Sequence, residues 1–469
     1  MVPPMGGEWG WLHGPLEWGS PHAVPPTPLF CQLSERYGPM FTVHLGSQKT
    51  VVLSGYEAVR EALVGTGQEL ADRPPIPIFQ LIQQGGGIFF SSGARWRAAR
   101  RFTVRVLHSL GVGQGPVAGK VLQELASLTG KLDGFRGELG LDTPAWGLHF
   151  ELFPQSWPFL MALKVPHLPE SCLPTGRPFP LALLGWAPSN ITFTLLFGQR
   201  FDYQDPVFQS LLGLIDEVMV LLGSPSLQLF NIYPRLGIFL GLHRPVLRKI
   251  EKGDDHLGLF TEANVVACTL DMLMAGTETT SATLQWAALL MAKHPDIQGR
   301  VQEELDRVLG AGRLPKPEDQ QQLPYTSAVL HEVQRYITLL PHVPRCTATD
   351  TQLGGYLLPK GTPVIPLLTS VLLDKTQWAT PRQFNPEHFL DSDRHFLKRP
   401  AFLPFSAGRR VCVGESLART ELFLLLAGLL QRYHLQPPPG ISPAALDTMP
   451  ALAFTMRPQA QALCAVPRH

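Results

Sequence analysis

A single cysteine stands in a short, glycine-bounded loop near the end of the chain, and a helical pattern begins directly after it. The loop, residues 405–414, has the sequence FSAGRRVCVG and contains Cys412, with Arg410 two positions earlier. Leucines recur at helical spacing from residue 415 to 433, so a helix should direct its positive N-terminal end at the sulfur. Gly408 and Gly414 allow backbone N–H groups to turn toward it. The pattern predicts a cysteine held as a thiolate.

Haem is the cofactor that suits a thiolate in this setting. Haem iron accepts a cysteine thiolate as its axial ligand, and Arg410 can reach a haem propionate. The alternative is a buried structural cysteine, which is the commoner role of an arbitrary cysteine. Phenylalanine, glycine, arginine and cysteine in this register favour haem b (iron protoporphyrin IX), with Cys412 as the ligand of the metal.

The composition allows one large domain and argues against some classes of function. The chain has 469 residues, of which 45% are hydrophobic and 16% are charged, enough for a large core organised by one cofactor. A formal net charge of +1 argues against nucleic-acid binding. The six cysteines are scattered without a CxxC pair, which argues against a disulfide framework and against structural zinc.

The first 30 residues are expected to form an irregular segment. Proline, glycine and tryptophan follow one another there without periodicity, and no run of about twenty apolar residues occurs. The sequence therefore predicts that residues 1–30 lack a membrane anchor and that residues 31–469 form a single domain.

Residues 260–293 contain no proline and predict a single helix of about 50 Å. Near its middle, the small pair Ala275 and Gly276 should let a flat ligand approach the backbone. Glu278 and Thr279 follow, an acid and a hydroxyl that can deliver protons. The alternative is structural, because a mid-helix threonine can bond to a carbonyl one turn earlier and a glutamate is often solvated.

Two pairs of residues have spacings that place both members on one helix face. Glu332 and Arg335 are three apart, which is ordinarily a solvated ion pair of small energetic value. Trp96 and Arg100 are four apart in an arginine-rich stretch, so they share a face while the other arginines point elsewhere.

Together these motifs resemble the cytochrome P450 superfamily. The loop 405–414 is similar to its haem-binding signature, Ala-Gly-x-Glu-Thr to its oxygen-binding groove, and Glu-x-x-Arg upstream of residues 384–389 to its buried structural pair. The resemblance covers most of the chain and is greatest to microsomal family 2, particularly its subfamily W. It implies an α+β, mainly α fold, with a long central helix over the haem and a small β-sheet region.

The resemblance also implies an activity, partners and a location. It implies a haem-thiolate monooxygenase that inserts one atom of O₂ into apolar small molecules, whether xenobiotic, lipid, retinoid or steroid-like. Electrons would come from NADPH through NADPH–cytochrome P450 reductase, with cytochrome b5 as a second candidate donor. The protein would lie at the membrane surface of the endoplasmic reticulum.

The resemblance assigns roles to particular residues. Glu278 and Thr279 would act as proton relay and dioxygen stabiliser, and the propionates would be held by Trp96, Arg100, Arg345 and Arg410. Glu332 and Arg335 would stabilise the segment before the cysteine loop, where His388 replaces the arginine of many members. A positive patch suited to an acidic electron donor would comprise Arg95, Arg97, Arg101, Arg409 and Arg419.

The chain departs from this family at two internal places. Residues 138–175 have no periodicity and form an atypical insert. Near Lys252, a basic helical stretch ends abruptly where family members continue in helix, which indicates a deletion. These departures suggest an alternatively spliced or mispredicted translation. Two alternatives to the monooxygenase therefore remain: a haem-thiolate isomerase or dehydratase, which tends to lack the acid and threonine pair, and a variant unable to hold haem.

Overall fold

A computed structural model describes residues 26–112, 115–135, 177–249, 263–310, 312–451 and 453–468. The insert at 138–175, the junction near Lys252 and residues 1–25 of the expected N-terminal segment lie outside these ranges. The expectation of an irregular segment is wrong for residues 26–30, which begin the helix Pro26–Tyr37.

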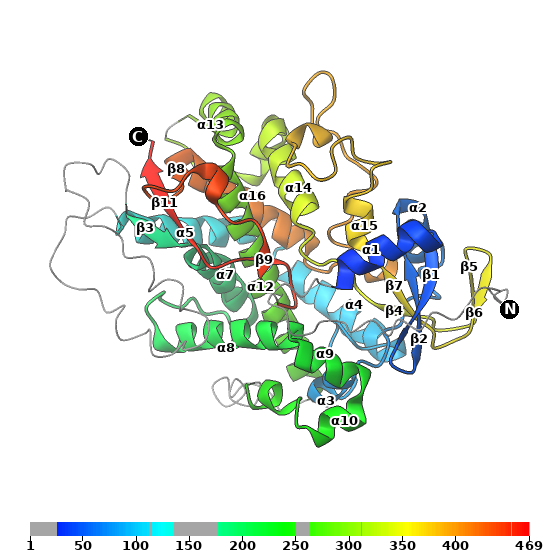
Figure 1. Cartoon of the computed structure of the whole chain (residues 1–469). Helices are drawn as coiled ribbons and strands as arrows, with labels where there is room; N and C mark the ends of the chain where they lie inside the picture. The colour runs from blue at the N-terminus through cyan, green and yellow to red at the C-terminus, as the bar shows by residue number, and fades with distance from the viewer. Residues whose placement is uncertain are drawn as a thin grey trace.

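Helices dominate the described residues, and short strands form small sheets beside them (Figure 1). The helices are α1 (Pro26–Tyr37), α2 (Tyr56–Arg60), α3 (Pro77–Gln83), α4 (Gly93–Ser109), α5 (Gly115–Asp133), α7 (Trp186–Phe197), α8 (Pro206–Gly223), α9 (Pro225–Ile232), α10 (Pro234–Phe239), α12 (Ala263–Lys293), α13 (Pro295–Leu309), α14 (Pro324–Ile337), α15 (Leu368–Leu372) and α16 (Glu415–Arg432). The strands are β1 (Met40–Leu45), β2 (Gln48–Leu53), β3 (Pro178–Pro180), β4 (Arg345–Cys346), β5 (Thr351–Leu353), β6 (Tyr356–Leu358), β7 (Pro363–Pro366), β8 (Tyr433–Gln436), β9 (Pro450–Ala451), β10 (Arg457–Pro458) and β11 (Ala462–Pro467). The expected mainly α fold is confirmed.

The largest sheet joins strands that lie about 300 residues apart in the sequence. Its order is β1-β2-β7-β4, with β1 and β2 an antiparallel hairpin and β7 parallel to β2. A parallel pair needs a long crossover, which here is the helical body between residues 53 and 363. A second sheet has the order β3-β11-β8. In Figure 1 the first sheet and α1 lie at one side of the helical body, and the second sheet lies at the other.

Helix α12 forms the centre of the helical body. Its 31 residues span about 46 Å, and it packs against α7, α14 and α16. Residues 287–292 are each at most 1% exposed, because this half of the helix is apolar on all faces and is surrounded by other helices. The single long helix expected from residue 260 to 293 is therefore present.

A buried ion pair attaches α14 to the segment that precedes the cysteine loop. Glu332 and Arg335 are both fully buried, with Arg335 Nη2 2.6 Å from Glu332 Oε1. Arg335 also donates to the carbonyl oxygens of Leu372, Pro381 and Gln383. The remaining carboxylate lone pairs accept from the Asn385 N–H and lie 3.2 Å from Nδ1 of His388. This pair is thus fully hydrogen-bonded, as a buried ion pair must be, and His388 is its third member.

Candidate active site

The cysteine loop is a tight turn closed by backbone hydrogen bonds. The Cys412 N–H donates to the Phe405 carbonyl at 3.1 Å, and the Val411 N–H to the Gly408 carbonyl at 3.2 Å. Gly408 has φ +72°, and a Cβ there would overlap the carbonyl oxygen of Leu63, so only glycine fits. Helix α16 begins three residues after Cys412, as the sequence pattern predicts.

Opposing effects act on the Cys412 thiol. Desolvation by the surrounding protein raises its pKa, the Gly414 N–H lowers it, Glu415 raises it and Arg100 lowers it. The net pKa is raised, so the protein alone does not hold the sulfur as a thiolate. The side chain is nevertheless accessible, unlike those of Cys346 and Cys464, which are buried. A coordinated metal ion would complete the deprotonation, because a ligating thiol loses its proton.

Four buried or half-buried guanidinium groups gather near this loop: those of Arg73, Arg100, Arg345 and Arg410. Burial, together with the charges of Arg345 and Arg100, lowers the pKa of Arg410 to about 9 against an opposing effect of Asp72. Burial and the charge of Arg100 lower the pKa of Arg345 to about 10. Burial, Arg345 and Arg410 likewise lower the pKa of Arg73. These charges repel one another.

Neutral groups hold the four arginines in place. Arg100 Nη2 donates to the Val411 carbonyl at 2.7 Å, and Arg345 Nη2 to the Ser406 hydroxyl at 3.0 Å. Arg410 lies 4.1 Å from the ring centroid of Trp96 and donates to the carbonyl oxygens of Ala71, Ile88, Phe89 and Ser91. Arg73 donates to the carbonyl oxygens of Phe89 and Pro344.

This arrangement fits haem. Across the described ranges, no carboxylate forms an ion pair with any of these four arginines. Mutually repelling buried cations need anions, and the two propionates of haem supply two negative charges beside the thiolate. Arg100, Arg345 and Arg410 were expected here from the sequence. Arg73 was missed, because nothing local distinguishes it from a surface arginine; only its contacts with Phe89 and Pro344 place it in the cluster.

Helix α12 turns an accessible strip toward the interior of the molecule. Ala275 and Thr279 lie on this strip, whereas Thr277 and Glu278 are buried. Thr279 Oγ1 donates to the Ala275 carbonyl at 2.7 Å, the bond to the preceding turn that the sequence left open. The expectation for Gly276 is wrong. A Cβ there would lie 2.6 Å from Thr192 Oγ1, so this glycine permits close packing against α7 and does not face a flat ligand.

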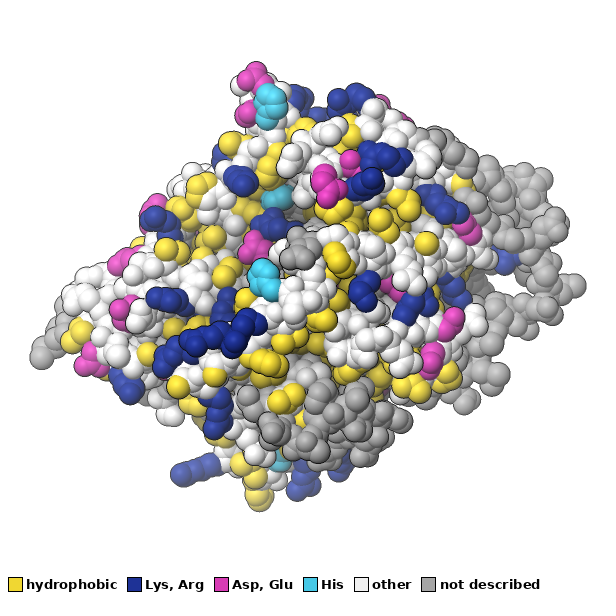
Figure 2. Space-filling view, turned by 180° about the vertical axis from the view of Figure 1, so that it is seen from behind, with side chains coloured by type: hydrophobic (Ala, Val, Ile, Leu, Met, Phe, Trp, Pro, Cys, Tyr) yellow, Lys and Arg dark blue, Asp and Glu magenta, His cyan; other side chains and the backbone are white. Residues whose placement is uncertain are grey.

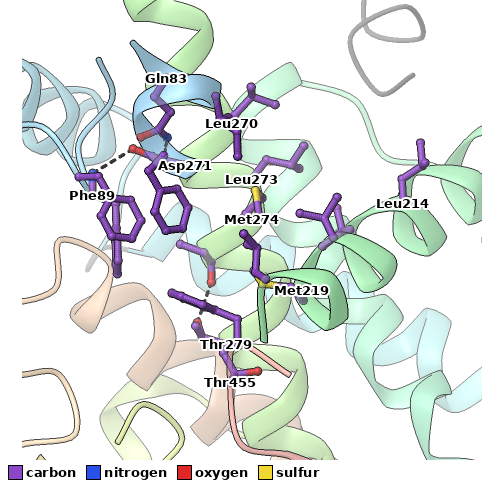
Figure 3. A pocket seen from close by; sticks show the side chains of 18 of the residues that line it. Gln83, Phe89, Leu214, Met219, Leu270, Asp271, Leu273, Met274, Thr279 and Thr455 are labelled. Carbon is purple, nitrogen blue, oxygen red and sulfur yellow. Dashed lines mark hydrogen bonds between the residues drawn. The ribbon is translucent and has the colours of Figure 1, made fainter. Parts of the chain in front are cut away.

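An apolar pocket opens from this strip, and Figure 3 shows the side chains that line it. Apolar residues predominate, among them Phe79, Phe90, Ile215, Met219, Met274 and Phe454. The acid in this pocket, Asp271, accepts hydrogen bonds from the Ile88 N–H at 2.6 Å, the Phe89 N–H at 2.9 Å and the Gln83 amide at 2.5 Å. Asp271 therefore fixes the loop at residues 83–89.

The expected positive patch is only partly present. Arg95, Arg97, Arg101 and Arg409 are exposed. Arg419 does not belong to it, because it is half-buried and held by two partners: the Glu415 carboxylate at 2.8 Å and Nε2 of His331 at 2.8 Å. Burial and the charge of Arg419 together lower the pKa of His331 to about 4, so the imidazole is neutral. Basic side chains also gather on the face seen in Figure 2.

Comparisons with known proteins agree with this site. The model of the cytochrome P450 family matches residues 4–147, 179–258 and 245–465. The chain is 70% identical to cytochrome P450 2W1 of Homo sapiens over 471 residues, which cover 93% of this chain and 88% of that protein. It is 68% identical to cytochrome P450 2W1 of Mus musculus, with the same shares covered, and 38% identical to cytochrome P450 2K6 of Danio rerio, with 93% and 86% covered. The chain therefore belongs to the cytochrome P450 family, within family 2 and subfamily W, and is a monooxygenase whose haem has a cysteine thiolate as axial ligand.

Proposed function

We propose that this protein oxidises apolar small molecules at the surface of the endoplasmic reticulum, with electrons from NADPH delivered by NADPH–cytochrome P450 reductase. The pocket carries this proposal. Its lining is almost entirely apolar, and its charged members are already engaged, Asp271 with the loop at 83–89 and Lys249 with Glu217. A substrate with a charged group would therefore find no available partner among these side chains, which favours an apolar one.

The chain's own residues would hold and serve the cofactor. Cys412 would be the axial ligand, and haem held by a thiolate supplies the activation of O₂ for insertion of one oxygen atom. Trp96, Arg100, Arg345 and Arg410 would bind and orient the propionates, together with Arg73. Thr279 presents its hydroxyl at the pocket and Glu278 supplies an acid one residue earlier, so these two residues would manage protons.

An electron donor would dock beside α4 and the cysteine loop. Arg97, Arg101 and Arg409 are exposed there, and Phe102 on the same helix is 58% exposed. A basic surface with an apolar side chain fits an acidic protein such as the reductase, or cytochrome b5 as a second donor.

Membrane contact is supported by an apolar surface around α10. Leu236, Ile238, Phe239 and Leu240 are 48%, 53%, 85% and 54% exposed. Side chains of this kind insert into the boundary of a bilayer. Within the described ranges, α8 has the length and hydropathy of a membrane-spanning segment. However, its buried residues Leu211, Ile215 and Met219 line the pocket, so we assign it to the fold.

Reconstitution tests the proposal. The purified chain is combined with the reductase, lipid vesicles and NADPH under ¹⁸O₂, and apolar test substrates are analysed by mass spectrometry. Products that contain one ¹⁸O atom and require NADPH support the proposal. Turnover of a hydroperoxide without NADPH or reductase would instead favour the isomerase or dehydratase class, and failure to incorporate haem would favour the inactive variant.

A further inference from the structure

Glu278 and Thr279 are neighbours in sequence, but they contact different parts of the molecule. Thr279 donates to its own helix, at the Ala275 carbonyl, and lines the pocket. Glu278 is 8% exposed and accepts a hydrogen bond from the hydroxyl of Thr455, far along the chain. Consecutive helical residues are about 100° apart around the axis, so the two side chains diverge. Among the hydrogen bonds of the described residues, none joins Glu278 to Thr279.

Thr455 connects Glu278 to the pocket. Its side chain is only 2% exposed, yet it lines the same pocket as Thr279. Figure 3 shows Thr279 and Thr455 at the same end of that pocket. Glu278 itself is not among the lining residues. Thr455 therefore lies between a buried acid and the space where a substrate would bind, with its hydroxyl on the acid.

The backbone around Thr455 is fixed on both sides. We call residues 453–457 the C-terminal strap. Within it, the Phe454 N–H donates to the Met219 carbonyl of α8 at 2.9 Å, and the Met456 N–H to the Leu339 carbonyl at 2.9 Å. The indole N–H of Trp286 donates to the Met456 carbonyl at 2.7 Å. The Thr455 hydroxyl is thus held in a constant position, as a relay group requires.

Glu278 is suited to carry a proton at this place. Burial raises its pKa, the charge of Arg457 and the bond from Thr455 lower it, and Asp216 raises it. The net pKa is raised, so the protonated form persists to higher pH than in an exposed glutamate. Arg457 on β10 pairs with Asp216 on α8, and Asp216 is 50% exposed. This ion pair joins the strap to α8 and brings charged groups from both elements toward Glu278.

We propose that Thr455 is a second hydroxyl relay, which passes protons from Glu278 into the pocket. This inference rests on the proposed monooxygenase function and deepens it. In the transfer, Glu278 gives its proton to Thr455 Oγ1 while that oxygen releases its own proton to a water or reacting group in the pocket. The hydroxyl is unchanged, and Glu278 becomes a carboxylate that solvent reprotonates. Thr279, whose hydroxyl is bonded to the Ala275 carbonyl in this structure, remains the first hydroxyl at the pocket.

Two substitutions at one position separate relay from packing. Thr455→Val keeps the shape of the side chain and removes the hydroxyl, whereas Thr455→Ser keeps the hydroxyl and removes a methyl group. The relay predicts that Thr455→Val lowers the kcat of NADPH-dependent oxidation roughly 10- to 100-fold with little change in KM. Thr455→Ser should retain most of the kcat. Thr277→Val is the matched control, since Thr277 lies on α12 beside Glu278 and its buried hydroxyl has no hydrogen-bond partner among the described residues. Its kcat should match that of the parent.

A second readout does not depend on turnover. Infrared difference spectra, with Glu278→Gln to identify the band, report the carbonyl stretch of protonated Glu278. Because the bond from Thr455 lowers the pKa of Glu278, Thr455→Val should raise the pH at which this band disappears, and Thr455→Ser should not.

Each result decides between defined outcomes. If Thr455→Val keeps the parental kcat and its infrared band is unchanged, the relay is overturned, whereas the proposed monooxygenase function still stands. Equal losses in Thr455→Val and Thr455→Ser, with the band unmoved, assign Thr455 to packing and also overturn it. If the unsubstituted chain binds carbon monoxide without a thiolate-type spectrum, the proposed function fails and the relay with it.

Discussion

The cysteine side and the pocket side of this molecule are built differently. On the cysteine side, the essential groups lie in short motifs: the loop at 405–414, the Glu332 and Arg335 pair, and the Trp96 and Arg100 pair. On the pocket side, the decisive contacts join distant segments. Asp271 accepts a hydrogen bond from Phe89, 182 residues earlier in the chain, and Glu278 accepts one from Thr455, 177 residues later. Short motifs thus identify the cofactor chemistry, although contacts between distant segments assemble the arginine cluster around it. On the pocket side, no short motif identifies the contacts that decide what enters.

The largest loss of stability is expected from breaking the buried ion pair between Glu332 and Arg335. Arg335→Ala leaves the Glu332 carboxylate fully buried without its cation, which costs about 3–5 kcal/mol of unfolding free energy. Urea unfolding and haem content should both show the loss. Arg300→Ala is the control, because the Arg300–Glu387 pair is exposed and contributes at most about 1 kcal/mol. Equal small losses in both variants would contradict the structural role of the Glu332 pair.

The motifs explain which parts of the structure could be predicted. The loop around Cys412, the start of α16 and the long helix α12 depend on residues close in sequence, and each was anticipated. The burial of the Glu332 pair was anticipated only through the family resemblance, because its other partners lie 37 or more residues away. Arg73, the partner of Gly276 on α7, the bond from Thr455 to Glu278 and the engagement of Arg419 by His331 were not. Each of these depends on which distant segment packs alongside, and a single sequence carries no local signal of that.

Removing one arginine of the cluster should weaken haem binding but should change the stability of the haem-free protein little. Arg100→Met removes a charge that lowers the pKa of Arg345 and of Arg410, but it also removes a bond to Val411. We expect little change in the thermal stability of the haem-free protein. Haem transfer to apomyoglobin should become roughly 10- to 100-fold faster, because a charge-assisted bond to a propionate contributes about 1.5–3 kcal/mol.

Arg105→Met on the same helix is the matched control. Its side chain is exposed and, among the described residues, donates to the Arg101 carbonyl alone, so haem transfer should keep its parental rate. A haem-free Arg100→Met protein that unfolds far more readily than the parent would show that Arg100 supports the fold and not a bound anion.

A buried acid on α16 should make stability depend on pH. Glu421 is 1% exposed, its Oε2 has no hydrogen-bond partner among the residues that the structure describes, and burial raises its pKa well above the ordinary value. Its folded pKa therefore exceeds its unfolded pKa, so stability falls as pH rises between the two, by about 1.4 kcal/mol per pH unit. Glu421→Gln should remove this loss. Melting temperatures from pH 5 to 8 should then decline less in the variant; parallel curves would contradict the assignment.

The smallest effect is expected where the insert joins the domain. The Arg177 N–H donates to the Phe135 carbonyl at 3.2 Å, and the rings of Phe135 and Phe179 lie 6.3 Å apart. The described ends of the segment therefore meet, and a chain that lacks residues 138–175 should fold with equal or slightly higher stability. Thermal unfolding and haem content measure this outcome. Loss of haem when the insert is deleted would show that the haem-binding domain requires the insert. Transcript reads across codons 137, 176 and 252 would test the splicing hypothesis itself.

The central claim is that Cys412 supplies the thiolate of a working haem site. The most direct test is the carbon monoxide difference spectrum of the reduced protein, compared with that of Cys412→Ala. Cys268→Ala serves as the control, since Cys268 lies on α12 and its pKa is raised to about 11 by burial and by Asp271. We expect a thiolate-type band in the parent and in Cys268→Ala, and its absence in Cys412→Ala. A histidine-type spectrum in the parent, or a thiolate-type band that survives Cys412→Ala, would contradict the account.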